Sequence, residues 1–327
     1  MQEPVLVVGP GAIGLALTAG FRRGGRRVAL LGRSPAAERR LADAGFEVAT
    51  PDGRGTRIKG GLVAARALEG PAPAAFFCVK AGDAARAAAA ARRWIGPDTL
   101  VVALQNGIGH EKVFRTAFGP RRTVIGVCYF AADRPAPDEL RLNGGEDVLL
   151  ARHDGNDTAL ATAAGLLTTA GFRVHLKEGE AGMLWTKAAF NAAVNPLGAA
   201  CAVESGKLVE DPALREISLR ALSEAAAAAE AAGHPLDYPD MEEKLLASGR
   251  NAPHQRNSML QDLSAGRRTE AAVILGPLLA AARRSGAPAP TLELLADVIA
   301  RLERALSAPA ARGRGRVAGR RAARSAA

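Results

Sequence analysis

The sequence predicts a chain of two folded parts, an α/β part built on a parallel sheet followed by an all-α part. Short apolar runs alternate with helical stretches through the first half, as in βαβ units. After about residue 177, long helical stretches replace this alternation. The 327 residues suffice for roughly two domains. We therefore expect a sheet domain over 1–177, a helical domain over 178–307 and a basic tail over 308–327.

The first apolar run, Val5–Val8, has the character of a central parallel strand. It is followed by a Gly-x-Gly-x-x-Gly turn, a helical stretch and a second apolar run over 28–31. This order within about 30 residues is typical of a Rossmann-type parallel sheet domain, in which a pyrophosphate meets free N–H groups at the helix N-terminus. The alternative is a glycine-rich turn without a ligand. The predicted cofactor contacts in this turn are Gly9, Gly11, Ala12, Ile13 and Gly14.

The residues after the second strand indicate which dinucleotide is bound. NAD sites usually place an Asp or Glu here, which binds the ribose 2′-hydroxyl. This chain has Gly32, Arg33 and Ser34 instead. A guanidinium can bind a 2′-phosphate through charge-assisted hydrogen bonds, with help from the Ser34 hydroxyl. We therefore expect NADP(H) rather than NAD(H), and the alternative for Arg33 is an ordinary surface arginine.

Two further predicted strands end in polar residues. Lys80 follows the run 75–79, and Asn106 follows the run 100–104. In an open parallel sheet, ligands bind beyond the carboxyl ends of the strands. We therefore expect Lys80 and Asn106 at the crevice that holds cofactor and substrate. A helix is expected between 83 and 94, and strands over 123–129 and 147–150.

The second half is expected to be helical and to carry a polar stripe. The predicted helices span 180–195, 213–232, 238–247, 258–285 and 292–306, and Pro196 should end or kink the first of them. In that first helix, Lys187, Asn191 and Asn195 stand four apart and lie on nearly one face. Burying these groups without partners would cost about 1–3 kcal/mol each. The stripe is therefore expected to face a ligand, or else to form a buried network between the domains.

Several motifs occur in order along the chain. After the glycine turn come Val79-Lys80, Leu104-Gln105-Asn106-Gly107-x-Gly109, Trp185-x-Lys187 with Asn191 and Asn195-Pro196-Leu197, Ser258-Met259-Leu260-Gln261-Asp262, and Thr269-Glu270. The ordered set resembles the ketopantoate reductase (2-dehydropantoate 2-reductase) family over nearly the whole chain up to the tail. The resemblance implies NADPH-dependent reduction of a 2-keto acid, in the family case ketopantoate in pantothenate and coenzyme A biosynthesis.

The resemblance also implies roles for individual residues. The catalytic pair is Lys187 and Glu270, the second of which binds the lysine and reaches the cofactor. Hydride delivered to a ketone carbon leaves a developing alkoxide, and a positioned acid typically contributes about 10²–10⁴-fold. Burial is expected to lower the pKa of Lys187, and Glu270 to oppose that fall. The substrate positions are Asn106, Asn191, Asn195 and Ser258, and the cofactor positions outside the glycine turn are Arg33, Lys80, Asn106 and Glu270.

The match is looser on the substrate side. After Glu270 the family pattern has polar residues, whereas this chain has the apolar run 271–275 before Gly276. The reaction type is therefore better supported than the substrate. The alternatives are a paralogous NADPH-dependent reductase of another 2-keto acid, a 3-hydroxyacid or an imine, and a non-enzymatic NADPH sensor. For Asp262, a surface carboxylate and a site residue both stay open.

Composition and charge argue against several other classes. Much of the net charge of +10 comes from the arginines of the tail, which have no aromatic residues among them, so a solvated appendage without a specific nucleic-acid partner is expected. The three cysteines form no Cys-x-x-Cys pair, and no metal site or disulfide framework is expected. The absence of a signal-like segment or a long apolar run predicts a cytoplasmic protein with no membrane partner. Oligomeric state stays open, a homodimer included.

Overall fold

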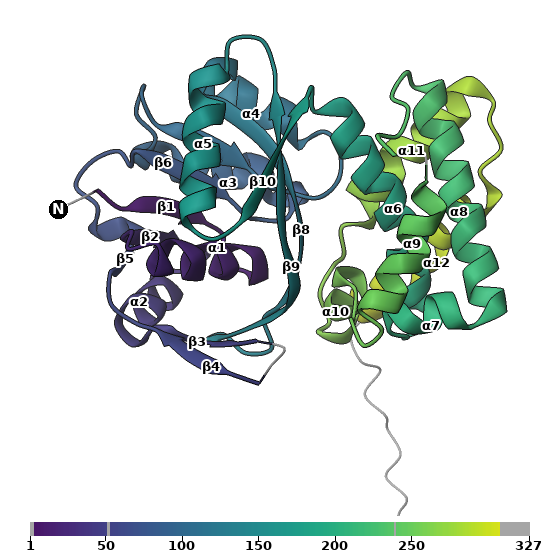
Figure 1. Ribbon diagram of the computed structural model, residues 1–327, viewed down its shortest axis with the longest axis horizontal. Coiled ribbons are helices and arrows are strands. Elements are labelled where there is room, and N and C mark those ends of the chain that lie inside the picture. Colours follow the sequence, from purple (N-terminus) through teal and green to yellow (C-terminus); the bar gives the residue numbers. More distant parts are fainter. Residues whose placement is uncertain (1–2, 51–52, 239, 308–327) are drawn as a thin grey trace, which may run out of the picture.

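The computed structural model describes residues 3–50, 53–238 and 240–307. Figure 1 shows a sheet with its covering helices beside a bundle of helices. The predicted fold class, a Rossmann-type sheet followed by an all-α part, is confirmed, although the sheet is mixed and not purely parallel. The last strand ends at Glu178 and the bundle begins at Ala181. The domain boundary at 177/178 stays a prediction, and the predicted tail, 308–327, lies outside the described residues.

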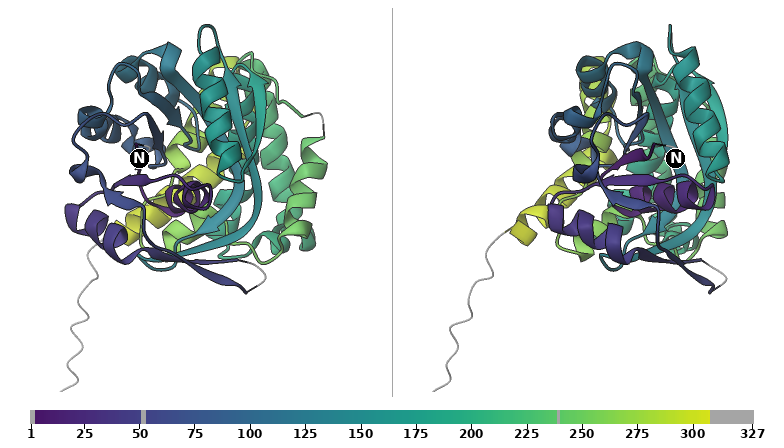
Figure 2. Two further views of the ribbon diagram at one scale, coloured as in Figure 1. Left: turned by 60° about the vertical axis from the view of Figure 1, so that its left-hand side comes forward. Right: turned by 90° about the vertical axis from the view of Figure 1, so that its left-hand side faces the viewer.

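The sheet combines a parallel part with an antiparallel extension. Its strands are β1 (Val5–Val8), β2 (Val28–Leu31), β3 (Phe46–Ala49), β4 (Gly55–Ile58), β5 (Leu62–Ala64), β6 (Ala74–Phe77), β7 (Leu100–Ala103), β8 (Thr123–Asp133), β9 (Glu139–Arg152) and β10 (Arg173–Glu178). The order β5-β2-β1-β6-β7-β8 is parallel throughout. β9 then pairs antiparallel with β8, and Figure 2 shows how strongly these two long strands curve.

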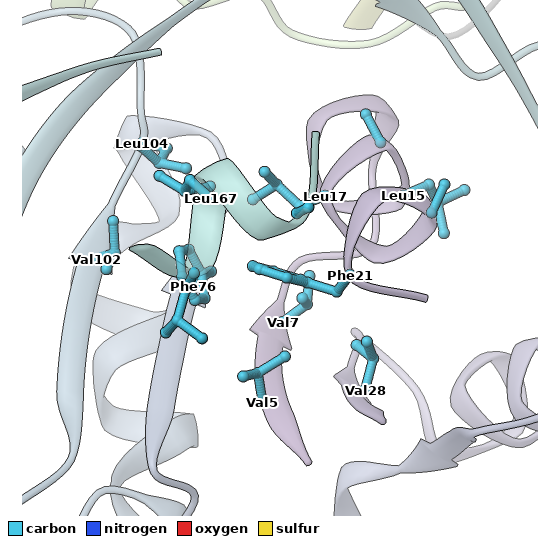
Figure 3. Packing of buried hydrophobic residues seen from close by; sticks show 14 of the residues in the cluster. Val5, Val7, Leu15, Leu17, Phe21, Val28, Phe76, Val102, Leu104 and Leu167 are labelled. Atoms are coloured by element: carbon cyan, nitrogen blue, oxygen red, sulfur yellow. The ribbon is translucent and has the colours of Figure 1, made fainter. Parts of the chain in front are cut away.

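Helices cover both faces of the sheet, because the central strands are apolar on both sides. They are α1 (Ala12–Arg23), α2 (Pro35–Ala44), α3 (Ala84–Ala91), α4 (His110–Phe118) and α5 (Asp157–Thr169). Val5 and Val7 of β1 pack in one cluster with residues of α1 and α5, as Figure 3 shows, whereas Leu6 and Val8 pack with residues of α3 and α4. Each such side chain contributes about 1.5–3 kcal/mol when fully buried. This double burial holds the carboxyl ends of the strands in fixed positions.

The helical part is built around one buried helix. Its members are α6 (Ala181–Ala200), α7 (Ser205–Glu210), α8 (Pro212–Ala231), α9 (Met241–Asn251), α10 (Ser258–Ser264), α11 (Ala271–Ser285) and α12 (Pro290–Ser307). α6 packs against α8, α10, α11 and α12, and it also touches β8 of the sheet. Its alanines allow close approach to the alanines of α8. Among the described helices, none has both the length and the apolar character needed to cross a membrane.

The predicted ends of two helices are wrong, whereas the kink that Pro196 could cause instead of an end stays a prediction. α6 does not end at Pro196 but runs on to Ala200, because one missing N–H costs less than the packing that surrounds this buried helix. The single helix predicted over 258–285 is broken into α10 and α11. Gly266 adopts a left-handed backbone conformation with φ +65° in the break. The break leaves Glu270 as the residue that precedes α11, outside any regular helix.

Candidate active site

The glycine turn between β1 and α1 is shaped by close packing. Gly9 has φ +89°, and a Cβ there would lie 2.6 Å from Cγ1 of Val79. A Cβ on Gly14 would collide with the carbonyl oxygen of Gly9. A Cβ on Gly11 would meet nothing within 4 Å, and no side chain caps the N-terminus of α1. The predicted contacts Gly9, Gly11, Ala12, Ile13 and Gly14 thus lie at an uncapped helix N-terminus that is open at Gly11, which fits a pyrophosphate.

The loop between β2 and α2 holds Arg33 in an exposed position. The Arg33 side chain is 83% exposed, and its guanidinium lies 3.1 Å from a carboxylate oxygen of Asp83. Ser34 caps α2, since its Oγ accepts a hydrogen bond from the N–H of Ala37 at 3.3 Å. The Ser34 hydroxyl can still donate to a phosphate oxygen. The ion pair between Arg33 and Asp83 is exposed and therefore weak. Arg33 can turn away from Asp83, and Arg33 and Ser34 are then both available to a 2′-phosphate.

A buried glutamate that the sequence analysis missed lies beneath this loop. Glu38 is fully buried and accepts a hydrogen bond from the N–H of Gly32 at 3.1 Å. Burial raises the pKa of Glu38, against the lowering effects of the Gly32 N–H and of Arg66, whose Nε lies 3.5 Å away. Its only sequence signal is an acid one turn after the Ser34 cap. The contact fixes the backbone immediately before Arg33.

The junction of the two parts brings together Lys80, Asn106 and Glu270. One Glu270 carboxylate oxygen accepts from the N–H of Ala81 at 3.0 Å, and the other lies 3.5 Å from Nδ2 of Asn106. Lys80 Nζ donates to the carbonyl oxygen of Arg268 at 2.6 Å. It also pairs with Asp262 at 2.6 Å. Both predicted strand-end residues therefore lie against the loop that precedes α11.

Glu270 is held at this junction as a partly desolvated acid. Burial is the largest influence and raises the pKa of its carboxyl, and Asp262 acts in the same direction. The hydrogen bonds from Ala81 and Asn106 and the charge of Lys80 oppose the rise. Asp262 itself is buried and pairs with Arg267 at 3.1 Å as well as with Lys80. It is therefore not a free surface carboxylate.

The polar stripe lies along α6 without hydrogen bonds or ion pairs to the described residues. Asn191 and Asn195 are only 6% and 5% exposed. Within the described part of the chain, the side-chain amides of Asn191 and Asn195 make no hydrogen bond, and Lys187 has no ion pair. Burial lowers the pKa of Lys187 to about 8. None of the polar atoms of these three side chains is among the fully buried unpartnered atoms of the described residues, so these groups are open to a small molecule on an otherwise apolar face, which indicates a ligand-binding face.

The expected pairing of Lys187 with Glu270 is not present in the described structure. Glu270 is occupied by Ala81 and Asn106, and Lys187 lies over aromatic rings. Nζ of Lys187 is 4.0 Å from the ring centroid of Tyr129 on β8. Glu270 therefore does not oppose the fall of the lysine pKa. The sequence analysis missed Tyr129, because the spacing of residues along the chain does not show that the distant segments β8 and α6 are in contact.

Ser258 begins α10, next to α6. Ser258 is exposed. The preceding residue, Asn257, caps α10, because its side-chain oxygen accepts a hydrogen bond from the N–H of Leu260 at 2.9 Å. Nδ2 of Asn257 is buried without a partner among the described residues and lies against Gly198 of α6. The turn before α10 is thus anchored to α6 near the end of the stripe. The sequence singled out Ser258 and not Asn257, whose side chain sets where that serine stands.

Comparisons with known proteins identify the family of this chain. Residues 5–155 match the family described as ketopantoate reductase PanE/ApbA, and residues 181–303 match its C-terminal counterpart. The 2-dehydropantoate 2-reductase of Halobacterium salinarum is 30% identical over 297 residues, which cover 90% of this chain and 97% of that protein.

Solved structures show the same fold. That of 2-dehydropantoate 2-reductase from Methylococcus capsulatus has a TM-score of 0.79 at 28% identity, covering 94% of this chain and 99% of that one. D-mandelate dehydrogenase with NADH and anilino(oxo)acetate has a TM-score of 0.85 at 22% identity, covering 93% and 100%, and shows a shared fold. The family predicted from the ordered motifs is therefore confirmed. The chain belongs to the ketopantoate reductase family of NADP(H)-dependent oxidoreductases.

Proposed function

We propose that this protein reduces a 2-keto acid to a 2-hydroxy acid with NADPH. Ketopantoate (2-dehydropantoate), reduced to pantoate in pantothenate and coenzyme A biosynthesis, is the first candidate substrate. The observation that carries the proposal is the α6 face, where Asn191 and Asn195 make no hydrogen bond to the described residues and Lys187, which lies over aromatic rings, has no ion pair among them. A substrate carboxylate and hydroxyl would supply the missing hydrogen bonds.

In this proposal the nicotinamide, when bound, supplies the hydride. Gly9, Gly11, Ala12, Ile13 and Gly14 would hold the pyrophosphate through the backbone. Arg33 would bind the 2′-phosphate, and Lys80 would contact the cofactor from the end of β6. The preference for NADPH over NADH rests on Arg33, because no carboxylate occupies the first positions after β2.

Lys187 is proposed to donate the proton to the carbonyl oxygen of the substrate. A pKa of about 8 leaves it mostly protonated at neutral pH and makes it a stronger acid than an exposed lysine. Asn191, Asn195 and Ser258 would bind the substrate, and Asn106 would contact substrate and cofactor. Glu270 is proposed as the second catalytic group, acting from the cofactor side through its contact with Asn106.

The test is NADPH oxidation with a panel of carbonyl compounds. The panel contains ketopantoate, pyruvate, 2-ketoisovalerate and phenylglyoxylate as 2-keto acids, with a 3-keto acid and a cyclic imine as controls. We expect turnover with at least one 2-keto acid, fastest with ketopantoate. Turnover confined to the 3-keto acid or the imine would overturn the proposal, and tight NADPH binding without any turnover would favour a sensor.

Another branched or aromatic 2-keto acid is the second candidate substrate. It is favoured by the apolar run after Glu270, where the family pattern is polar, and by the aromatic rings beside Lys187. The same panel decides between the two candidates through their ratio of kcat/KM. Cytoplasmic location and a homodimer stay predictions.

A further inference from the structure

The lysine of the α6 stripe lies among aromatic rings instead of carboxylates. Its Nζ is 4.0 Å from the ring centroid of Tyr129 and 6.0 Å from that of Phe190, one turn along the same helix. Among the described residues, no carboxylate lies within ion-pair distance of this Nζ. An ammonium on a half-buried side chain without a counter-charge is partly desolvated, so whatever stabilises its charge also decides how much of it is protonated.

We propose that Tyr129 is a positioning residue, whose ring face holds the Lys187 ammonium in place and keeps it charged before the substrate binds. The inference rests on the proposed role of Lys187 as proton donor. An aromatic ring has a negative face that attracts a cation within about 6 Å of its centroid. Tyr129 lies well inside that limit, whereas Phe190 lies at it.

The strand that carries Tyr129 fixes where the ring stands. β8 pairs with β7 only over residues 123–125, whereas Tyr129 is paired on the β9 side, in register with Asp147 and directly before a shift of the β8–β9 register. The lysine comes from α6, so the contact joins the two parts of the molecule. A rigid ring on a paired strand restricts a side chain that otherwise has many rotamers.

The titratable groups around this contact leave the ring as the main source of charge stabilisation. Cys128 on β8 is buried, which raises the pKa of its thiol to about 12 and keeps it neutral. Burial, Tyr238 and Asp237 all raise the pKa of Tyr129, so its hydroxyl is neutral as well. Asp237, in the loop before α9, is already paired with Lys177 at 3.3 Å. A neutral phenol ring is therefore what faces the ammonium.

The sign of the effect follows from which form the ring favours. The ring stabilises the ammonium and not the amine, so it raises the pKa of Lys187 against the larger, opposite effect of burial. Removing the ring should lower that pKa further. An interaction of the size usual for a desolvated cation corresponds to about one pH unit.

The experiment compares Tyr129→Leu, which removes the ring, with Tyr129→Phe, which removes only the hydroxyl. Two quantities are measured: the pH profile of kcat/KM for the best 2-keto acid, and the NMR titration of the Lys187 side chain in the substrate-free protein. The Lys187 signal is assigned by its loss in Lys187→Ala. We expect the basic limb and the NMR midpoint of Tyr129→Leu to move down by about one pH unit, which lowers activity about fivefold at pH 8. Tyr129→Phe should match the wild type in both.

Two results would overturn the inference. One is a Tyr129→Leu protein whose Lys187 titrates as in the wild type. The other is a Tyr129→Phe protein that shifts as far as Tyr129→Leu, because the hydroxyl and not the ring would then be responsible. If Tyr129→Leu does not fold, Tyr129→Met keeps the bulk without the ring and takes its place. A failure of the proposed function is seen separately, as unchanged turnover in Lys187→Ala, since the NMR titration needs no turnover.

Discussion

The glycine turn after β1 and the polar face of α6 are prepared for ligands in opposite ways. In the turn, backbone groups are proposed to bind the cofactor, and the conformation is fixed by packing between Gly9, Gly14 and Val79. On α6, side chains are proposed to bind the substrate, and Asn191 and Asn195 make no hydrogen bond in the described structure. The conformation of the turn is therefore determined by protein contacts alone, whereas the polar groups of the α6 face lack hydrogen bonds until a ligand binds.

This difference separates effects on folding from effects on catalysis. Changes in the turn should act on the fold and on cofactor binding together, because the same glycines serve both. Changes on α6 should act on the substrate and leave the fold largely intact, since these polar groups contribute little to the fold. Each prediction below tests one side of that distinction.

The largest expected effect is on turnover in Lys187→Ala. Loss of the proton donor should lower kcat by at least about 10²-fold, while NADPH binding measured by fluorescence titration stays within about twofold. Lys207→Ala, at an exposed lysine paired with Glu210 at 2.9 Å, is the matched control and should behave as the wild type. A Lys187→Ala protein with normal turnover would remove the lysine from the mechanism.

The next effect is on stability, in Gly14→Ala. The added methyl group collides with the Gly9 carbonyl and should lower the free energy of unfolding by about 2 kcal/mol, as well as weaken NADPH binding. Gly11→Ala is the control, because its methyl group meets no protein atom within 4 Å. It should unfold like the wild type in urea and yet bind NADPH less tightly. Equal stability of the two variants would contradict the packing described for the turn.

A smaller effect is expected on cofactor choice in Arg33→Asp. The ratio of kcat/KM for NADPH to that for NADH should fall by at least about tenfold, because a charge-assisted contact to the 2′-phosphate is replaced by repulsion. Arg86→Asp is a close control, since Arg86 pairs with the same Asp83 carboxylate at 2.6 Å. An unchanged ratio in Arg33→Asp would mean that the arginine is an ordinary surface residue.

The pH dependence of the wild-type protein gives the mildest test. Lys187 can donate a proton only when protonated, and its pKa is lowered to about 8. The kcat/KM for keto acid reduction should therefore be flat between about pH 6 and 7.5 and fall about tenfold per unit well above pH 8. A basic limb that begins only near the pKa of an exposed lysine would place the proton donor elsewhere.

The same distinction explains what could be predicted from the sequence. The glycine turn and the Lys187 stripe are local patterns, in which the spacing of residues decides which groups share a turn or a face. The break at Gly266 was missed, because the residues around it favour a helix and one glycine is a weak signal. Glu38 and Tyr129 were missed because their roles depend on contacts between distant segments, which residue type alone does not report.

The measurement that tests the account most directly is the stability and KM of Asn195→Leu. Leucine has the branched shape of asparagine, with two methyl groups in place of the amide oxygen and nitrogen, and needs no hydrogen bonds, so a largely buried amide that makes no protein hydrogen bond can be replaced without loss of stability. We expect a midpoint of thermal unfolding equal to or above that of the wild type, with KM for the keto acid raised by about 10–100-fold. A lower midpoint with an unchanged KM would contradict the account, since the amide would then belong to the fold and not to the substrate.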